Sequence, residues 1–394
     1  MIQRHITTEL KARFLASRSL YIFGPRQSGK TTLARETFPE LRYISLEDPD
    51  HLAFATDDPR GFLNQFETQG IIDEPQRCPS LFSYLQSEID IKKKKFILTS
   101  SQNFLLMEKV SQSLAGRISL LNLLPLSLSE IEHRPLIPFP DLLNQHTSAS
   151  FDTLNNRLET IITGGYPELW ENPAARSYWH SDYVRTYLER DVRQILQVQD
   201  LGRFNQFLKL TAGRSGSLLN KASLAADCGL SETHCARWLS ILEQSGIIYL
   251  LKPFYQNYNK RLTKSPKLYF NDTGLLCHLL SISTPTHLET HPLFGNIVET
   301  FVVSELRKNH LNQGLDPDFY FWRDAKGEEI DLIVPHHTTL IPVEIKSTQT
   351  IKPETLKPLF KWMNLSGSQE AVLLYGGTDI QHRTQAVIFP ISAL

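Results

Sequence analysis

The most constraining feature of this chain is a short glycine-rich stretch near its beginning. Residues 24–31 read GPRQSGKT and fit the pattern G-x-x-x-x-G-K-T, between the apolar run 19–24 and a segment with helical periodicity. In that setting, backbone N–H groups close around a phosphate and the following helix N-terminus adds a favourable dipole. We therefore predict a phosphate-binding loop. Its predicted nucleotide-contacting residues are Gly24, Pro25, Arg26, Gln27, Ser28, Gly29, Lys30, Thr31 and Thr32.

Three further short apolar runs extend this pattern into a sheet. They span 42–48, 70–74 and 95–102, and each ends in acidic or hydroxyl side chains. They alternate with helix-length segments, which predicts a parallel sheet with helices on both faces. Such sheets bind ligands at the carboxyl ends of their strands. We expect ATP and Mg²⁺ at this edge, with Lys30 bridging the β- and γ-phosphates and Thr31 ligating the metal.

The run GIIDEPQ supplies two adjacent acids at a predicted strand end. Asp73 is expected to hold Mg²⁺ through water, and Glu74 to polarise the water that attacks the γ-phosphate. A nucleotide kinase would not need the second acid, so the pair favours hydrolysis. The next run ends in Thr99, Ser100 and Ser101, any of which could sense the γ-phosphate; we include Ser100 among the nucleotide-binding residues.

Arg117 lies just before another predicted strand, a suitable place for an arginine finger that stabilises charge on a neighbour's nucleotide. A structural ion pair explains it equally well. Arg190 is a weaker candidate for the same role. An arginine that acts on a neighbour implies a homo-oligomer, although a monomer that opens and closes agrees with every motif.

The middle of the chain is basic. Residues 203–264 hold nine Lys or Arg against three Asp or Glu, within a chain of net charge −1. Two predicted helices, the second capped by Ser231, precede two strands joined by a basic loop, which is typical of a winged helix. We predict nucleic-acid contacts, with DNA favoured over RNA, from Arg237, Lys260, Arg261 and Lys264. The alternatives are a protein-docking module or an ATPase lid.

The stretch LIPVEIKS (340–347) contains Glu344 and Lys346 on one face of a predicted strand. The preceding strand carries Asp331, and Glu299 lies on the helix before it. Three acids and a lysine in this order suit metal-assisted phosphodiester cleavage, with Glu299, Asp331 and Glu344 as metal ligands and Lys346 assisting the water. The alternative is a buried ion-pair cluster, because an unpaired acid on a buried strand is costly.

Many motifs in order resemble a known group, the prokaryotic AAA-family ATPases whose P-loop domain precedes a conserved domain of unknown function. The motifs that carry the resemblance are YIFGPRQSGKTTL, YISLEDP, IIDEPQR, ILTSSQ, LAGRISLLNLLPLSLSE, TYLERDV, KLYFNDTGLLCHLL, GNIVETFVVSEL, FYFWRD, EIDLIV and PVEIKS. The spaced Asp and Glu-x-Lys also resemble the restriction-endonuclease-like fold. Pro75 and Ser100 depart from the residues more usual at their positions.

These patterns predict an α/β chain with three domains. Residues 1–135 form a P-loop ATPase domain, 150–284 a helical and winged-helix domain, and 285–394 a restriction-endonuclease-like domain. The four cysteines lack zinc or disulfide spacing, and no signal peptide or membrane span is evident, so we expect a cytoplasmic protein. We predict an ATPase that acts on nucleic acid. The alternative is a nucleotide-switched signalling or scaffold ATPase with an inactive nuclease-like domain.

Overall fold

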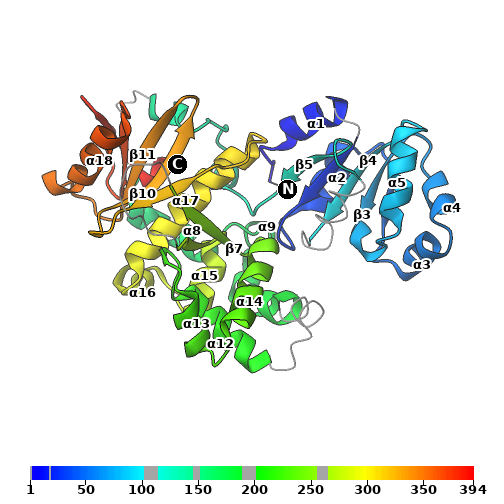
Figure 1. Ribbon diagram of the computed structural model, residues 1–394, viewed down its shortest axis with the longest axis horizontal. Helices are drawn as coiled ribbons and strands as arrows, with labels where there is room; N and C mark the ends of the chain where they lie inside the picture. Colours follow the sequence, from blue (N-terminus) through cyan, green and yellow to red (C-terminus); the bar gives the residue numbers. More distant parts are fainter. Residues whose placement is uncertain (1, 17–18, 102–113, 145–150, 189–200, 255–264) are drawn as a thin grey trace. The chain divides into compact units, whose positions relative to one another are not determined.

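The computed structural model describes residues 2–16, 19–101, 114–144, 151–188, 201–254 and 265–394 (Figure 1). The chain forms two compact units. Unit 1 comprises residues 1–126 with the short segments 244–247 and 311–315, and unit 2 comprises the remainder. The three predicted domain boundaries stay a prediction.

Unit 1 is built on a parallel sheet. Its five described strands have the order β2-β3-β4-β1-β5, and every pairing is parallel. The strands are β1 (Leu20–Phe23), β2 (Tyr43–Ser45), β3 (Gln69–Asp73), β4 (Lys95–Ser100) and β5 (Ser119–Asn122). The helices are α1 (Thr7–Ala16), α2 (Lys30–Thr37), α3 (Pro49–Asp57), α4 (Pro59–Asn64), α5 (Leu81–Asp90) and the short 3-10 helix η1 (Pro75–Arg77). The predicted parallel α/β sheet is confirmed.

Alternating side chains along β1 divide the core of unit 1 into two layers. Tyr21 packs with residues of α3, α4 and α5, whereas Leu20 and Ile22 pack with residues of α1 and α2. Helices therefore cover both faces, as the near-continuous apolar character of these strands predicts. At the carboxyl edge of the sheet, β1 is followed by the phosphate loop, β3 ends in the acid pair, and β4 ends in the hydroxyl run.

Unit 2 contains a mixed sheet. Its nine described strands have the order β13-β14-β12-β11-β10-β9-β7-β8-β6. They are β6 (Ser217–Leu218), β7 (Ile248–Pro253), β8 (Lys267–Phe270), β9 (Tyr320–Arg323), β10 (Glu329–His336), β11 (Thr339–Lys346), β12 (Ala371–Tyr375), β13 (Gln381–Arg383) and β14 (Ala386–Pro390). Parallel pairing of β7 with β9 joins the strands of the basic segment to the C-terminal strands, so this sheet runs across the predicted boundary at residue 285.

The longer helices of unit 2 are α12 (Leu201–Ala212), α13 (Lys221–Asp227), α14 (Glu232–Gln244), α17 (Phe294–Asn312) and α18 (Pro353–Ser366). The shorter ones are α7 (Leu128–Ile131), α8 (Leu158–Thr163), α9 (Pro167–Glu171), α10 (Trp179–Tyr183), α15 (Thr273–Leu279), α16 (Pro285–Thr290), the 3-10 helices η2 (Asp141–Asn144), η3 (Leu154–Arg157), η4 (Pro173–Ser177) and η6 (Ile391–Ala393), and the π-helix η5 (Val184–Leu188). Among the described residues, no helix combines the length and apolarity needed to cross a membrane.

Two predicted features of the basic segment are present. Gly229, at φ +62°, follows the end of α13, and the hydroxyl of Ser231 accepts a hydrogen bond from the backbone N–H of His234 (3.3 Å) in the first turn of α14. The two strands that follow, β7 and β8, pair antiparallel. The loop between them, with Lys260, Arg261 and Lys264, lies outside the described residues, as does Arg190.

Candidate functional site

The phosphate loop follows β1 in a conformation that needs glycine. Gly24 has φ +152°, and a Cβ there would approach the carbonyl oxygen of Leu123 to 2.1 Å. Gly29, at φ +90°, is the N-cap of α2. The loop can therefore close only because the first glycine has no side chain, and closure brings the first N–H groups of α2 to the carboxyl edge of the sheet.

Two side chains of the loop, those of Lys30 and Ser28, could donate further hydrogen bonds to a phosphate. The Lys30 ammonium is buried and donates to the loop's own Pro25 carbonyl (2.7 Å). The Ser28 hydroxyl is buried and has no hydrogen-bond partner among the described residues. Burial lowers the pKa of Lys30 to about 8, against the opposing influence of Glu74 and Asp73. An anion within this loop would add counter-charge beside the buried ammonium of Lys30 and favour its charged form.

The remaining predicted contacts of the loop are arranged around it. Arg26 lies 4.0 Å from the carboxylate of Glu47, and Gln27 has φ +60°. Thr32, with Thr31, lines a cavity of about 700 Å³ beside α2.

Arg4 supports the loop from outside the motif. Its guanidinium is buried and donates to the carbonyls of Ser28 (2.8 Å) and Leu124 (2.7 Å). It thereby ties the phosphate loop to the segment that follows β5. The sequence prediction missed Arg4, because no local pattern shows that a residue of the N-terminal segment contacts a loop 24 positions later.

Asp73, at the end of β3, is surrounded by hydroxyl groups. Its Oδ1 accepts hydrogen bonds from Thr31 (3.0 Å) and Thr99, and its Oδ2 from Tyr43 (3.1 Å) and Ser45 (3.2 Å). The structure therefore brings together Thr31 and Asp73, the two predicted Mg²⁺ residues. A carboxylate that accepts hydrogen bonds from four neutral hydroxyl groups, one of them that of Thr31, fits a hard divalent cation that prefers oxygen ligands.

Glu74 follows Asp73 in a left-handed backbone conformation (φ +54°) that turns its side chain along the same edge. Its carboxylate accepts hydrogen bonds from the backbone N–H (3.0 Å) and hydroxyl (3.2 Å) of Ser101, and from the amide of Gln76. Burial raises the pKa of Glu74, while Lys30 opposes that shift. Glu74 is thus fixed in direction and is more basic than an ordinary glutamate, which suits a group that accepts a proton from water.

The three hydroxyl side chains at the end of β4 point in two directions. Thr99 bonds to Asp73 and Ser101 bonds to Glu74, so both contact the acid pair. Ser100, the residue predicted to contact the nucleotide, instead bonds to the phenol of Tyr21. Side chains alternate along a strand, so Ser100 points to the face opposite that of its two neighbours.

Arg117 lies at the other edge of the sheet. β5 starts in register with the start of β1, Ser119 opposite Leu20, so Arg117 is at the amino ends of the strands. Its guanidinium forms an ion pair with Asp90 at the end of α5 (2.7 Å). From there it does not reach the phosphate loop of its own chain. A role on a neighbour's nucleotide stays a prediction.

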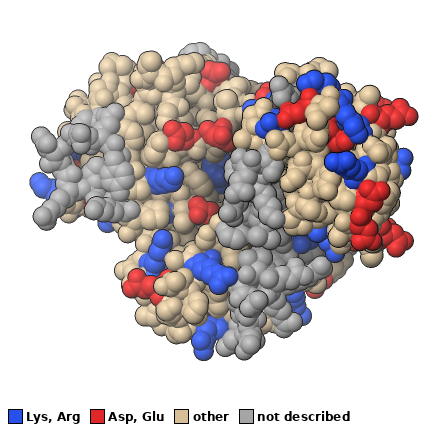
Figure 2. Space-filling view, turned by 45° about the vertical axis from the view of Figure 1, so that its right-hand side comes forward, with Lys and Arg blue, Asp and Glu red and all other residues tan. Residues whose placement is uncertain are grey.

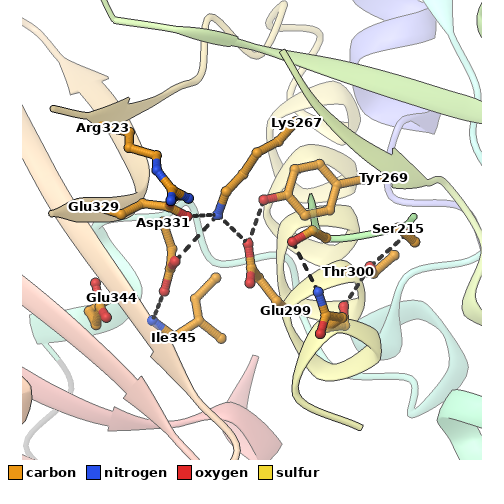
Figure 3. Close-up of polar contacts among 12 residues, drawn as sticks. Ser215, Lys267, Tyr269, Glu299, Thr300, Arg323, Glu329, Asp331, Glu344 and Ile345 are labelled. Carbon is orange, nitrogen blue, oxygen red and sulfur yellow. Dashed lines mark hydrogen bonds and ion pairs between the residues drawn. The ribbon is translucent and has the colours of Figure 1, made fainter. Parts of the chain in front are cut away.

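In unit 2, the predicted nuclease-like residues gather around a lysine that the sequence prediction missed (Figure 3). The buried ammonium of Lys267 contacts Glu299 on α17 (2.8 Å), Asp331 on β10 (3.5 Å) and also Glu329. We call these four residues the Lys267 cluster. Tyr269 donates to the same oxygen of Glu299 (2.6 Å). Lys267 and Tyr269 are alternate residues of β8, so both project toward α17 and β10.

Glu344 and Lys346 flank the Lys267 cluster. Lys346 Nζ lies 2.6 Å from Glu344 Oε1 and 3.9 Å from Asp331 Oδ2, which also accepts a hydrogen bond from the backbone N–H of Ile345 (3.0 Å). The second oxygen of Glu344 is buried with no partner among the described residues. Burial, reinforced by the charge of Asp331, raises the pKa of Glu344 to about 8 and that of Glu299 to about 7.

Arg237, the described member of the predicted nucleic-acid set, projects from the exposed side of α14. Thr233 and His234, in the first turn of the same helix, are also exposed. On the face shown in Figure 2, basic side chains of the described residues are interspersed with acidic ones and do not form one continuous basic surface.

Family comparisons match three successive segments. Residues 16–132 match the family described as AAA domain, 155–286 match Domain of unknown function (DUF8612), and 294–394 match Domain of unknown function (DUF4143). Uncharacterized proteins of Mycobacterium tuberculosis (Rv2008c) and Mycobacterium bovis (Mb2031c) are each 29% identical over 377 residues, which cover 93% of this chain and 75% of theirs.

Two solved structures align with most of the chain. The Walker-type ATPase paby2304 of Pyrococcus abyssi aligns over 71% of this chain and 96% of its own, at 15% identity and a TM-score of 0.46. The ORC1 protein of Aeropyrum pernix, in complex with DNA, aligns over 71% and 93%, at 14% identity and a TM-score of 0.30. The family match and the parallel sheet together confirm the predicted resemblance at the coarser level: residues 16–132 are similar to AAA-type P-loop ATPase domains.

Proposed function

We propose that this chain binds ATP with Mg²⁺ and hydrolyses it, and that the nucleotide state controls how unit 2 contacts nucleic acid. One observation carries the first part: Thr31, Asp73 and Glu74 meet at the carboxyl edge of a parallel sheet, directly beside a closed phosphate loop. A bound Mg²⁺ would neutralise charge developing on the phosphates, and the hydroxyl-lined Asp73 carboxylate and Thr31 would hold it.

The described residues divide the work of hydrolysis. On ATP binding, the Lys30 ammonium exchanges the Pro25 carbonyl for phosphate oxygens, and Ser28 gains a partner for its buried hydroxyl. Glu74 accepts a hydrogen bond from the attacking water and orients it toward the γ-phosphate. Ser101 keeps the carboxylate pointed along the sheet edge while this occurs. Arg117 lies at the opposite edge of the sheet, so it takes no part in turnover at the site of its own chain. It would act only if a second copy of the chain brought its Arg117 to this nucleotide.

The proposed nucleic-acid contact rests on the α13–α14 pair and the antiparallel β7–β8 strands, an order that supports a winged helix. In that arrangement the second helix enters the DNA major groove, and Thr233, His234 and Arg237 are exposed along α14. Contacts from such residues are mainly electrostatic, so the affinity is expected to fall steeply with salt.

The metal-dependent nuclease prediction is not part of the proposed function. The order α17, β9, β10, β11, α18 and β12 supports a restriction-endonuclease-like domain, because it places Asp331 and Glu344 on neighbouring strands. However, the predicted ligands Glu299 and Asp331 already contact the Lys267 ammonium. Among the described residues, no group of three or more His, Cys, Asp or Glu is arranged to hold a metal ion. This arrangement does not fit a divalent ion, so no cleavage step follows from it.

Phosphate release by the full chain tests the ATPase proposal. We expect turnover with ATP and Mg²⁺ that stops with EDTA, and ATP binding without turnover in Glu74→Gln. Wild-type protein that binds ATP and releases no phosphate, with or without DNA, would contradict hydrolysis.

A second assay tests the nucleic-acid part. Arg237→Ala should weaken binding of double-stranded DNA, whereas Lys357→Ala, at an exposed lysine of α18 in the same unit, should not. Equal binding by wild type and Arg237→Ala at several salt concentrations would favour the signalling or scaffold alternative.

A further inference from the structure

The Lys267 cluster contains more carboxylates than a lysine needs for pairing. Three acids surround a single ammonium, and they come from two separate elements, Glu299 from α17 and Glu329 and Asp331 from β10. Lys267 itself is 2% exposed, so water does not provide its solvation. Elsewhere in the described chain, the buried Lys94 pairs with one acid, Glu88 (2.9 Å), and a backbone carbonyl.

The charges around the cluster explain why so many acids are tolerated. The three carboxylates of the cluster all contact Lys267, and Glu329 also pairs with Arg323. Removal of Lys267 would leave these acids with Arg323 at Glu329 and with the half-exposed Lys346 3.9 Å from Asp331, so a replacement cation would be favoured between them. The ammonium thus occupies the centre that a metal bound by Glu299, Glu329 and Asp331 would occupy (Figure 3).

We propose that Lys267 is the resident cation of this site and excludes divalent metal ions from it. A metal within bonding distance of Glu299 and Asp331, at about 2.0–2.6 Å from their oxygens, would lie almost on the Lys267 Nζ and would be repelled by its charge. In the wild-type chain Mg²⁺ and Mn²⁺ therefore do not bind there. These three carboxylates are not arranged to hold a metal ion while Lys267 separates them, and loss of the ammonium lets them close around a divalent cation.

Lys346, the other lysine near these acids, differs from Lys267 in its exposure and position. The Lys346 side chain is 41% exposed and contacts Glu344 at the margin of the cluster, whereas the Lys267 side chain is 3% exposed and lies between the acids. In Figure 3, Glu344 lies apart from the Lys267 ammonium, beyond Asp331. Only replacement of Lys267 is therefore expected to open the centre of the cluster.

The test is Mn²⁺ titration of the nucleotide-free full chain by calorimetry, with circular dichroism to establish folding. We expect Lys267→Met to bind about one more Mn²⁺ per chain than wild type, and the double variant Lys267→Met, Asp331→Asn to lose that ion. Lys94→Met, which removes a buried lysine with a single acid partner, is the matched control and should gain none. A folded Lys267→Met chain with the wild-type stoichiometry would overturn the proposal.

A second comparison does not depend on the Lys267 variant folding. Asp331→Asn in the otherwise wild-type chain should leave the number of Mn²⁺ ions bound unchanged, because the resident lysine keeps metal out. If wild type binds an Mn²⁺ that Asp331→Asn loses, the site takes metal with Lys267 in place and the proposal is wrong. Any Mn²⁺ held by the phosphate loop is common to all these chains and cancels in the comparison.

Discussion

Two buried aspartates, one in each unit, have different partners. Asp73 accepts hydrogen bonds from four hydroxyl groups, those of Thr31, Tyr43, Ser45 and Thr99. Asp331 instead lies beside two ammonium groups, at 3.5 and 3.9 Å. A hydroxyl group orients a carboxylate without neutralising it, whereas an ammonium supplies the counter-charge. Asp73 is therefore oriented but still open to a metal ion, whereas Asp331 already lies beside two ammonium groups.

The largest effect is expected from the acid next to Asp73. Glu74→Gln keeps the size and hydrogen-bonding reach of the side chain but cannot accept a proton from water. We expect kcat for ATP hydrolysis to fall about 100- to 10,000-fold while ATP affinity stays near the wild-type value. Phosphate release and calorimetric ATP binding measure the two quantities. Loss of both together would mean that Glu74 holds the nucleotide site together and has no specific role in the chemistry.

Lys267→Met should have the next largest effect, on stability. Without metal, three carboxylates would lose a buried partner, and we expect the free energy of unfolding to fall by about 3–5 kcal/mol. Lys361→Met removes an exposed ion pair with Glu328 and should cost about 0–1 kcal/mol. Urea denaturation in EDTA measures both. Mn²⁺ should restore part of the loss in Lys267→Met alone, because a ligand that binds only the folded state stabilises it.

The contrast also explains what the sequence could predict. The phosphate loop and the pair Asp73 and Glu74 each come at the end of a strand. The alternation of strands with helices indicates that these strands are parallel, so the sequence alone predicted that the loop and the acids lie at the same edge of the sheet. The proximity of Asp331 and Glu344 followed in the same way from a short β-hairpin, which pairs the adjacent residues Leu332 and Val343. The partner side chains that determine the chemistry of each site were harder to predict from the sequence.

Lys267 is 32 residues from Glu299 and 64 from Asp331, on a strand of the basic segment. In the sequence it resembles the lysines of the adjacent loop, which were assigned to nucleic acid. Its only signal was the period-two pattern of KLYF, which places Lys267 and Tyr269 on one face of a strand whose residues are all buried. Long-range pairing of β8 with β7, and of β7 with β9, brings that face to the acids, and no local pattern encodes it.

The lysine of unit 1 should behave differently from Lys267 when the pH rises. Burial lowers the pKa of Lys30 to about 8, and a bound triphosphate would raise it again because it favours the ammonium form. Above pH 8, ATP binding must then take up a proton, so we expect ATP to bind about tenfold more weakly at pH 9 than at pH 7. Calorimetry at several pH values measures this. In Lys30→Arg, whose guanidinium does not titrate in this range, the affinity should not change with pH; an equal decline there would assign the effect to another group.

The smallest expected effect tests whether hydroxyl partners prepare Asp73 for a metal. Tyr43→Phe removes one donor to Asp73 Oδ2, and Ser45 still donates to the same oxygen. We expect the free energy of unfolding to fall by about 0.5–1.5 kcal/mol. The Mg²⁺ concentration for half-maximal ATP turnover should rise by less than about tenfold, since outer partners orient the groups that hold a metal. Tyr84→Phe, at a half-buried tyrosine of α5, is the control and should leave the Mg²⁺ requirement unchanged. An unchanged requirement in Tyr43→Phe would mean that the orientation of Asp73 does not limit metal binding, and the kind of group that surrounds a buried acid would no longer distinguish the two sites.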